Sequence, residues 1–183
     1  PFGIQLALSA DASTIVFLGR LWDGPPNAAA IYRYDRATRS VTALTEGVPN
    51  GVAVSGDGRF VAVDGLSSRL YDHADGSLRI VSRIPPAPFS SRPARGTDLS
   101  RDGRYVVFRT RSSEFAARFG IPFNDRMRIY RVDVITGEVV LVSRVGIDGP
   151  PAVADGDGCD IPFTLPCPDQ LFTPRISGNG RYV

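Results

Sequence analysis

The chain has 183 residues, a formal net charge of +2 and 43% apolar residues, a composition typical of a globular domain rather than a disordered chain. The sequence contains no apolar run of about eighteen residues, so we expect no transmembrane segment. All its basic residues are arginines, and they are scattered among acidic residues rather than gathered in blocks, so we expect no nucleic-acid partner.

Residues 4–46 are predicted to form the first of several similar units of four short β-strands. The segment 8–12 (LSADA) precedes an apolar run at 15–17 (IVF), which indicates two strands joined by a tight turn. A third strand at 31–35 (IYRYD) and a fourth at 40–45 (SVTALT) are rich in residues that favour strands.

The second unit is predicted over residues 50–83. Its turn has Asp57-Gly58 between apolar runs, a strong hairpin signal, because both central residues of a type I′ turn have positive φ. The first unit has Asp11-Ala12 instead and departs from this pattern. The strands of the second unit are predicted around VSGDGR (54–59), FVAV (60–63), LYDH (70–73) and LRIVS (78–82).

A third unit over residues 96–144 repeats the pattern, and a long insertion at 145–174 follows it. The start of a fourth unit is predicted at 175–183, which contains ISGNGRYV. The strands of the third unit are predicted around LSRDGR (99–104), YVVF (105–108), IYRVD (129–133) and VVLVS (139–143).

The spacing of the units indicates the architecture. The serines that open the four turns are separated by 46, 45 and 77 residues, and the first two intervals match a four-stranded propeller blade: Ser9, Ser55, Ser100 and Ser177. No segment shows a sustained helical period. We therefore predict an all-β fold, namely three four-stranded blades and the first strands of a fourth, as part of a larger β-propeller.

The repeat resembles the TolB-like, WD-repeat-like family of β-propeller repeats. Residues 100–108 (SRDGRYVVF), 129–133 (IYRVD) and 136–143, which begin with Thr-Gly and end in Ser, carry the resemblance best. The resemblance implies the propeller fold and a role as a scaffold for protein contacts. A fold alone does not fix an activity.

The lengths of the connections divide the predicted propeller into two faces. The turns between the first and second and between the third and fourth strands of each unit are short and share one face. Every insertion falls on the opposite face, and long loops on a rigid scaffold commonly bind partners. We expect that face to bind a protein or glycan through aromatic side chains; the alternative is that these side chains pack against their own blade: Trp22, Phe115, Phe119 and Phe123.

The insertion at 145–174 suggests two further features. Asp155, Asp157 and Asp160 have a D-x-D-x-x-D spacing that can bind calcium, and the alternative is a solvated glycine-rich turn. Cys159 and Cys167 are predicted to form a disulfide in a secreted protein and would be free thiols in the cytosol. No other cofactor is expected.

The sequence motifs favour binding over catalysis. His73 is the only histidine, the serine elbow G-x-S-x-G and the P-loop are missing, and Asp35 and Asp133 recur at one position of the repeat, which suggests a structural role. The first hypothesis is a non-catalytic scaffold that is secreted, periplasmic or on the cell surface. The second is an accessory propeller of a secreted hydrolase or peptidase whose catalytic domain lies outside residues 1–183. The third is a subunit of a surface assembly that self-associates through open blade edges.

Overall fold

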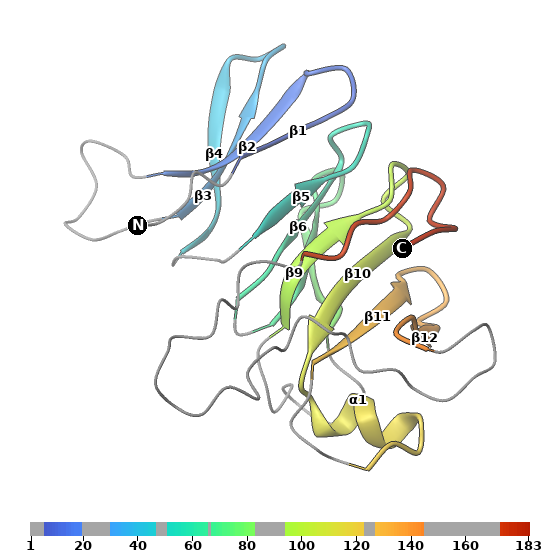
Figure 1. Cartoon of the computed structure of the whole chain (residues 1–183). Coiled ribbons are helices and arrows are strands. Elements are labelled where there is room, and N and C mark those ends of the chain that lie inside the picture. Colours follow the sequence, from blue (N-terminus) through green and yellow to red (C-terminus); the bar gives the residue numbers. More distant parts are fainter. Residues whose placement is uncertain are drawn as a thin grey trace, which may run out of the picture.

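The computed structural model describes residues 6–19, 30–46, 51–65, 67–82, 94–122, 127–144 and 173–183. Within these residues the chain forms three four-stranded antiparallel sheets and one short helix (Figure 1). In each sheet the strands follow one another in chain order, which is the meander of a propeller blade. The all-β prediction and the prediction of three four-stranded blades are both confirmed.

The strands are short, as the repeat predicts. The first sheet contains β1 (Leu6–Leu8), β2 (Thr14–Gly19), β3 (Ala30–Asp35) and β4 (Ser40–Glu46). The second contains β5 (Val52–Val54), β6 (Phe60–Val63), β7 (Arg69–Asp72) and β8 (Ser77–Ile80). The third contains β9 (Ala94–Leu99), β10 (Tyr105–Thr110), β11 (Arg128–Asp133) and β12 (Val139–Leu141).

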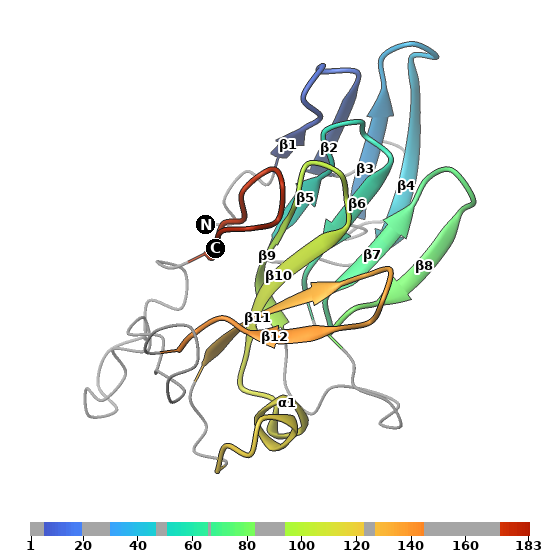
Figure 2. The ribbon, with the colours of Figure 1, turned by 90° about the vertical axis from the view of Figure 1, so that its right-hand side faces the viewer.

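The three sheets stack one after another through their faces. The first strands lie closest together, since β1 contacts β5 and β5 contacts β9. The last strands, β4, β8 and β12, lie on the opposite side of the stack and diverge from one another (Figure 2). The turns that join first to second and third to fourth strands gather on one side of the stack, which we call the short-turn face.

Apolar side chains fill the spaces between neighbouring sheets. One buried cluster centres on Val16, Ile31 and Val61 and joins the first sheet to the second. A larger cluster joins the second sheet to the third and includes Leu70 and Phe108. Burying such a side chain contributes about 1.5–3 kcal/mol, so this packing is what holds separate sheets together.

A helix that the sequence did not predict, α1 (Ser113–Arg118), lies between β10 and β11. Ser112 caps its N-terminus by accepting a hydrogen bond from the Phe115 N–H; Phe115 and Ala116 are buried, and Phe115 belongs to the larger core cluster. With six residues the helix has fewer than two turns, so it is too short to display a helical period in the sequence.

The third strand of the second sheet pairs in a register that its sequence motif does not reveal. Strand pairing places Asp72 opposite Phe60, just as Asp133 lies opposite Tyr105 and Asp35 lies opposite the second strand of its own sheet. Tyr71 therefore does not correspond to Tyr130, although both follow an aliphatic residue. The offset is two residues, so Tyr71 corresponds to Val132 and the alternation of faces along the strand is kept.

Candidate functional site

The short-turn face is built from four copies of one turn, each opened by a serine. In every copy the serine hydroxyl donates to the side-chain oxygen two residues later, over 2.6–2.8 Å. The serine hydroxyl oxygen also accepts a hydrogen bond from the backbone N–H five residues after the serine, over 2.9–3.0 Å. This pairing explains the recurrent Ser-x-Asp/Asn spacing, because it satisfies the polar groups of a tight loop locally.

The conformation of these turns corrects the type I′ prediction. Only the residue after the Asp or Asn has positive φ: it is 74° at Gly58 and Gly103, 70° at Gly180 and 56° at Ala12. Asp57 and Asp102 have ordinary φ values and each accepts the backbone N–H of the residue two positions later. The hairpins therefore have four-residue loops, and the departure at Ala12 does not change the turn.

Ion pairs link two of these turns to the next hairpin of the same sheet. Arg59 donates from Nε and Nη2 to the two carboxylate oxygens of Asp72, over 2.8 and 2.7 Å. Arg104 bonds Oδ2 of Asp133 from Nε at 2.9 Å and from Nη2 at 2.7 Å. Both carboxylates also accept a backbone N–H of the turn that follows them, at 2.9 Å. Each aspartate thus connects the two turns of its blade, which confirms the structural role predicted for Asp133.

The two carboxylates remain ionised in the folded protein. Hydrogen bonds from Arg59 hold the pKa of Asp72 below its ordinary value of 3.8, although burial opposes this shift. Burial also acts to raise the pKa of Asp133, but hydrogen bonds from Arg104 and the turn amides outweigh it and lower the pKa.

The first sheet reaches the same arrangement with different residues. Ser13 occupies the position of Arg59, and Arg33 of β3 donates instead to Asp35 over 3.2 Å and to Thr14 over 3.1 Å. Asp35 accepts the N–H of Ala37 at 3.0 Å, as its counterparts do in their turns. The structural role predicted for Asp35 is therefore confirmed as well.

Backbone hydrogen bonds join the turns of successive sheets into one rim. The Ala10 N–H donates to the Gly56 carbonyl at 2.9 Å, the Gly56 N–H to the Arg101 carbonyl at 2.7 Å, and the Arg101 N–H to the Gly178 carbonyl at 2.9 Å. The fourth turn thus continues the series beyond the third sheet. The rim gives the short-turn face a fixed geometry, which a binding surface requires.

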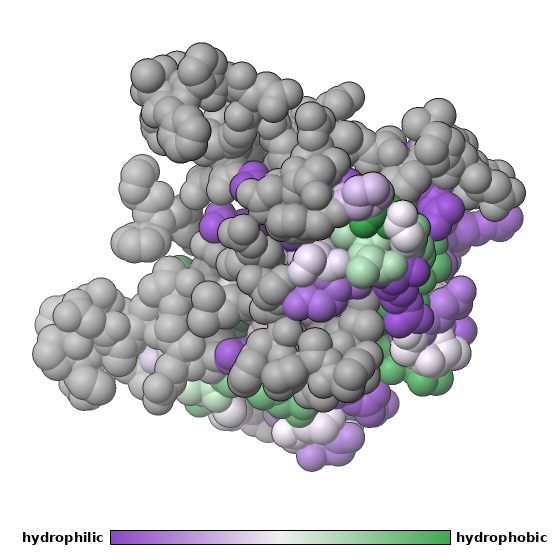
Figure 3. All heavy atoms as spheres, turned by 90° about the horizontal axis from the view of Figure 1, so that it is seen from below, coloured by the Kyte–Doolittle hydropathy of each residue, from purple (hydrophilic) through white to green (hydrophobic). Residues whose placement is uncertain are grey.

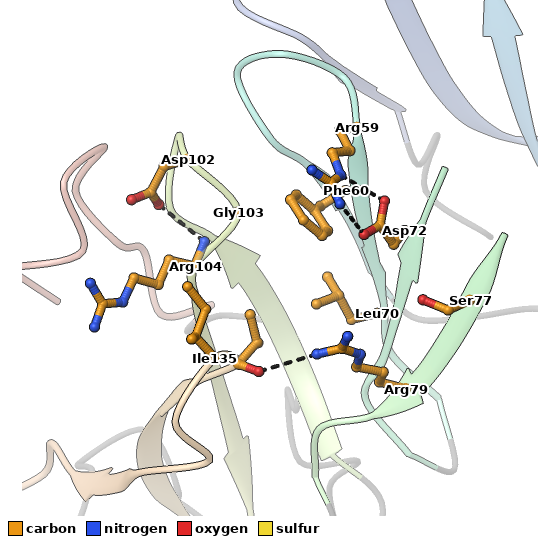
Figure 4. A pocket seen from close by; sticks show the side chains of 11 residues that line it. Arg59, Phe60, Leu70, Asp72, Ser77, Arg79, Asp102, Gly103, Arg104 and Ile135 are labelled. Atoms are coloured by element: carbon orange, nitrogen blue, oxygen red, sulfur yellow. Dashed lines mark hydrogen bonds and ion pairs between the residues drawn. The ribbon is translucent and has the colours of Figure 1, made fainter. Parts of the chain in front are cut away.

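A cleft of about 350 Å³ opens on this face between the second and third sheets (Figure 4). One wall carries the Arg59–Asp72 pair and the other carries Gly103 and Arg104. Phe60, Leu70, Val134 and Ile135 supply apolar surface to the cleft, and Ser77, Arg79 and Asp102 complete its lining.

Positive charge dominates the accessible part of the cleft. The side chains of Arg59 and Arg104 are 48% and 42% exposed, whereas their partners Asp72 and Asp133 are 8% and 5% exposed. Arg79 is exposed, and within the described residues its side chain donates to the Val134 carbonyl, over 3.3 Å. The guanidinium groups of Arg59 and Arg79 thus face the cleft, whereas that of Arg104 points away from it (Figure 4).

Asp102 is the exposed carboxylate of the cleft. Burial acts to raise its pKa, but hydrogen bonds from the Ser100 hydroxyl and the Arg104 N–H outweigh that effect and lower the pKa. Asp102 therefore stays ionised and lies on the far side of the cleft from Arg79 (Figure 4).

The aromatic residues predicted to bind a partner divide into described and undescribed positions. Phe115 is 1% exposed and packs edge-on against Phe108, with ring centroids 5.4 Å apart, so it follows the packing alternative. Phe119 is partly buried against the same core, and the Arg144 guanidinium lies 5.6 Å from its ring centroid. Trp22 and Phe123 lie outside the described residues.

The predicted calcium ligands Asp155, Asp157 and Asp160 and the predicted disulfide between Cys159 and Cys167 also lie outside the described residues. Within the part of the chain that the structure describes, no three His, Cys, Asp or Glu side chains gather to hold a metal ion. On the face that carries α1, the described hydrophilic and hydrophobic side chains are interspersed (Figure 3).

Sequence reasoning missed the cleft because it selected a face by loop length. The residues that form the cleft come from short turns, which carry no insertions. Two signals in the sequence mark it nonetheless: the Arg that ends each S-x-D-G-R segment of the second and third units, and the Asp that ends the third strand of the same unit.

Comparison with known proteins supports the fold. No protein-family model and no curated protein matches the chain. Among solved structures, TolB from Acinetobacter baumannii is similar with a TM-score of 0.53 and 19% identity, over 79% of this chain and 33% of that chain. An oligogalacturonate lyase in complex with manganese has a TM-score of 0.50 and 22% identity, over 75% of this chain and 38% of that one.

The β-propeller domain of the Trilobed protease from Pyrococcus furiosus is also similar, with a TM-score of 0.50 and 12% identity, over 75% of this chain and 42% of that one. Together these likenesses show that the chain has the fold of a TolB-like β-propeller. The chain spans between a third and about two fifths of the length of these structures.

Proposed function

We propose that this chain is part of a non-catalytic β-propeller scaffold that binds a protein partner. The observation that carries the proposal is the cleft between the second and third sheets, which combines apolar walls with exposed guanidinium groups. Protein interfaces are enriched in arginine and large apolar side chains, and they favour surfaces whose geometry is fixed before binding. The hydrogen-bonded rim of turns supplies that fixed geometry.

The roles of the recurrent polar residues support a scaffold. The serines, aspartates and arginines that repeat along the chain are engaged in turns and ion pairs, so their recurrence reflects the architecture of the blades. His73, the only histidine, is exposed in the turn after β7, and its backbone N–H donates to the Arg59 carbonyl at 2.9 Å. The resemblance to TolB-like repeats adds the expectation of protein contacts.

We place this scaffold outside the cytoplasm, whether secreted, periplasmic or on the cell surface. The resemblance supports this location, and a disulfide between Cys159 and Cys167 would be compatible with it. The structure describes no helix with the length and hydropathy of a membrane span. The long-loop face with Trp22 and Phe123, and calcium at Asp155, Asp157 and Asp160, remain predictions for a second surface.

A second candidate function is an accessory propeller of a secreted hydrolase or peptidase. The fold likeness to a protease propeller domain favours it, because that propeller is a domain of a protease. In that case the cleft would contact a catalytic domain of the same polypeptide. A third candidate, a subunit of a surface assembly, would place a second copy of the protein in the cleft.

Site-specific photo-crosslinking tests the proposal in the full-length protein within its producing cells. A photoreactive residue replaces Ile135, which lines the cleft and is 74% exposed, and a matched control replaces the exposed Arg36 in the turn after β3. Mass spectrometry identifies the adducts. We expect one protein partner at position 135 and none at 36.

The other outcomes decide between the candidates. An adduct within the same polypeptide, in a catalytic domain, would replace the scaffold proposal with the accessory propeller. An adduct with a second copy would favour the surface assembly. Equal labelling at positions 135 and 36, or none at either, would contradict a binding role for the cleft.

A further inference from the structure

We infer that the cleft between the second and third sheets binds an extended acidic peptide segment, with a carboxylate of the peptide paired to Arg79 and an adjacent apolar side chain between the two sheets. This inference rests on the proposed scaffold function and names the chemistry of the partner. It depends on the charge, the shape and the rigidity of the residues that line the cleft.

The charged side chains of the cleft wall differ in how far they are exposed. Two of the lining arginines are paired, but the carboxylates that pair them lie behind them, 8% and 5% exposed. Of these two guanidinium groups, that of Arg59 faces the cleft, whereas that of Arg104 points away from it (Figure 4). Arg59 uses Nε and Nη2 for Asp72, which leaves its Nη1 for a ligand.

In this inference, Arg79 is the residue that recognises the carboxylate of the peptide. Arg79 is the one arginine of the cleft lining that forms no ion pair within the described residues, and its single hydrogen bond is the 3.3 Å contact with the Val134 carbonyl. That contact holds the side chain across the gap from β8 toward the third sheet (Figure 4). The planar guanidinium keeps donors for a bidentate carboxylate.

The shape of the cleft suits one large apolar side chain. Phe60, Leu70 and Ile135 bound the space between the sheets, and Ile135 is 74% exposed at its mouth. A volume of about 350 Å³ accommodates a short chain segment with one large side chain, and it is at the small end of ligand sites. Filling it with an apolar side chain would remove Ile135 and Phe60 from water.

Asp102 sets the direction of the ligand. Its carboxylate lies on the far side of the cleft from Arg79 (Figure 4). A peptide whose acidic side chain reaches Arg79 would present backbone N–H groups toward Asp102. The two opposite charges therefore favour a segment that lies across the cleft over a compact anion that needs only one cation.

Contacts among the residues that line the cleft hold them in place. The Arg59 guanidinium lies 4.7 Å from the centroid of the Phe60 ring, and Gly103 of the next turn packs against the same ring. These contacts fix the lining before a ligand arrives, which lowers the entropy lost on binding. The first sheet has Ser13 where the second has Arg59, and its Arg33 is only 7% exposed, so it does not offer the same guanidinium to a ligand.

Fluorescence anisotropy with labelled peptides tests the inference on the full-length protein. The probes are acetyl-Gly-Leu-Glu-Gly-Gly-amide and the same peptide with Gln or Lys in place of Glu. We expect the Glu peptide to bind about fivefold more tightly than the Gln peptide, the factor of a partly exposed charge pair, and the Lys peptide to bind more weakly than both. Arg79→Gln should abolish the difference between Glu and Gln, and the control Arg36→Gln should preserve it.

Equal binding of the Glu and Gln peptides, or an equal loss in the two arginine variants, would overturn the inference. A protein adduct at position 135 that persists in Arg79→Gln would overturn only the acidic chemistry and leave the scaffold function standing. If crosslinking at position 135 also fails, both proposals are contradicted.

Discussion

The turn between β1 and β2 and its counterparts in the second and third sheets share one hydrogen-bond pattern but differ in their last two residues. The first turn ends in Ala12-Ser13, whereas the other two end in Gly58-Arg59 and Gly103-Arg104. All three place the first of these residues at positive φ. The difference shows that the Ser and Asp side chains specify the turn, and that Gly and Arg serve contacts beyond it.

The contacts of the glycines explain why they are needed. A Cβ added to Gly103 would lie 2.1 Å from Cδ2 of Phe60 in the preceding sheet, and one added to Gly58 would lie 2.3 Å from Oγ1 of Thr14. Ala12 is exposed, so its Cβ meets no such neighbour in the described residues. Gly thus marks the places where one blade packs onto the turn of the next.

The largest effect is expected from Gly103→Ala, which forces a Cβ into the Phe60 ring at a φ of +74°. The combined steric and backbone cost is about 2–4 kcal/mol of unfolding free energy. Gly76→Ala is the matched control, because it has a φ of +70° and nothing within 4 Å, so it should cost only about 1 kcal/mol. Urea unfolding of the full-length protein measures both, and equal losses would show that the packing onto Phe60 is unimportant.

Removal of the aspartates that link the turns should rank next. Asp133→Ala leaves the turn amides of Ile135 and Thr136 without their acceptor and Arg104 without its partner, at a cost of about 1–3 kcal/mol. Asp35→Ala should cost less, because that carboxylate is 24% exposed and water can replace it. Thermal unfolding of the two variants compares the sheets, and a larger loss for Asp35→Ala would reverse the ranking.

The carboxylates of Asp72 and Asp133 make the stability of the folded protein depend on pH. The pKa values of Asp72 and Asp133 are lowered in the folded protein, so their contribution is complete above the ordinary pKa of 3.8 and is lost as the pH falls through their folded values. We expect the unfolding free energy to fall below about pH 4. In Asp72→Asn this fall should be shallower, since one titrating group is gone. A pH profile as steep as that of the unaltered protein would exclude Asp72 as a source.

The smallest expected effect is an increase in the free energy of unfolding. Ala12→Gly should stabilise the protein by about 0.5–1 kcal/mol, because Ala12 has a φ of 56° that glycine adopts without strain. Ala10→Gly in the same turn is the control and should destabilise slightly, since Ala10 has no positive φ to relieve. The two midpoints of urea unfolding should move in opposite directions; movement in the same direction would show that Ala12 is not strained.

Much of this fold could be predicted from the sequence because each blade repeats the same local chemistry. The Ser-x-Asp-Gly-Arg segments and the strand composition indicate four-stranded units without any long-range information. The serines that end the fourth strands of the second and third units also have a physical role: Ser82 accepts the Ser68 N–H at 2.8 Å, and Ser143 accepts the Ile129 N–H at 3.2 Å.

What could not be predicted depends on contacts between units. The correspondence of Tyr71 with Val132 could not be predicted, because strand register is set by pairing across the sheet and a two-residue offset is invisible in a short motif. The cleft could not be located because its walls come from residues 59–79 of one sheet and 102–135 of the next. The burial of Phe115 likewise required the position of α1 against Tyr130, whose ring centroid lies 4.8 Å away.

The short-turn face is proposed to bind the partner through the cleft between the second and third sheets. Hydrogen–deuterium exchange of the full-length protein, alone and in complex with the partner identified by crosslinking, shows which residues the partner covers. We expect slower exchange at Arg59–Phe60, Ser77–Arg79 and Val134–Ile135 in the complex, with unchanged exchange in the β1–β2 turn. Slower exchange confined to residues 20–29 and 145–172 would move the binding surface to the long-loop face and contradict the proposal.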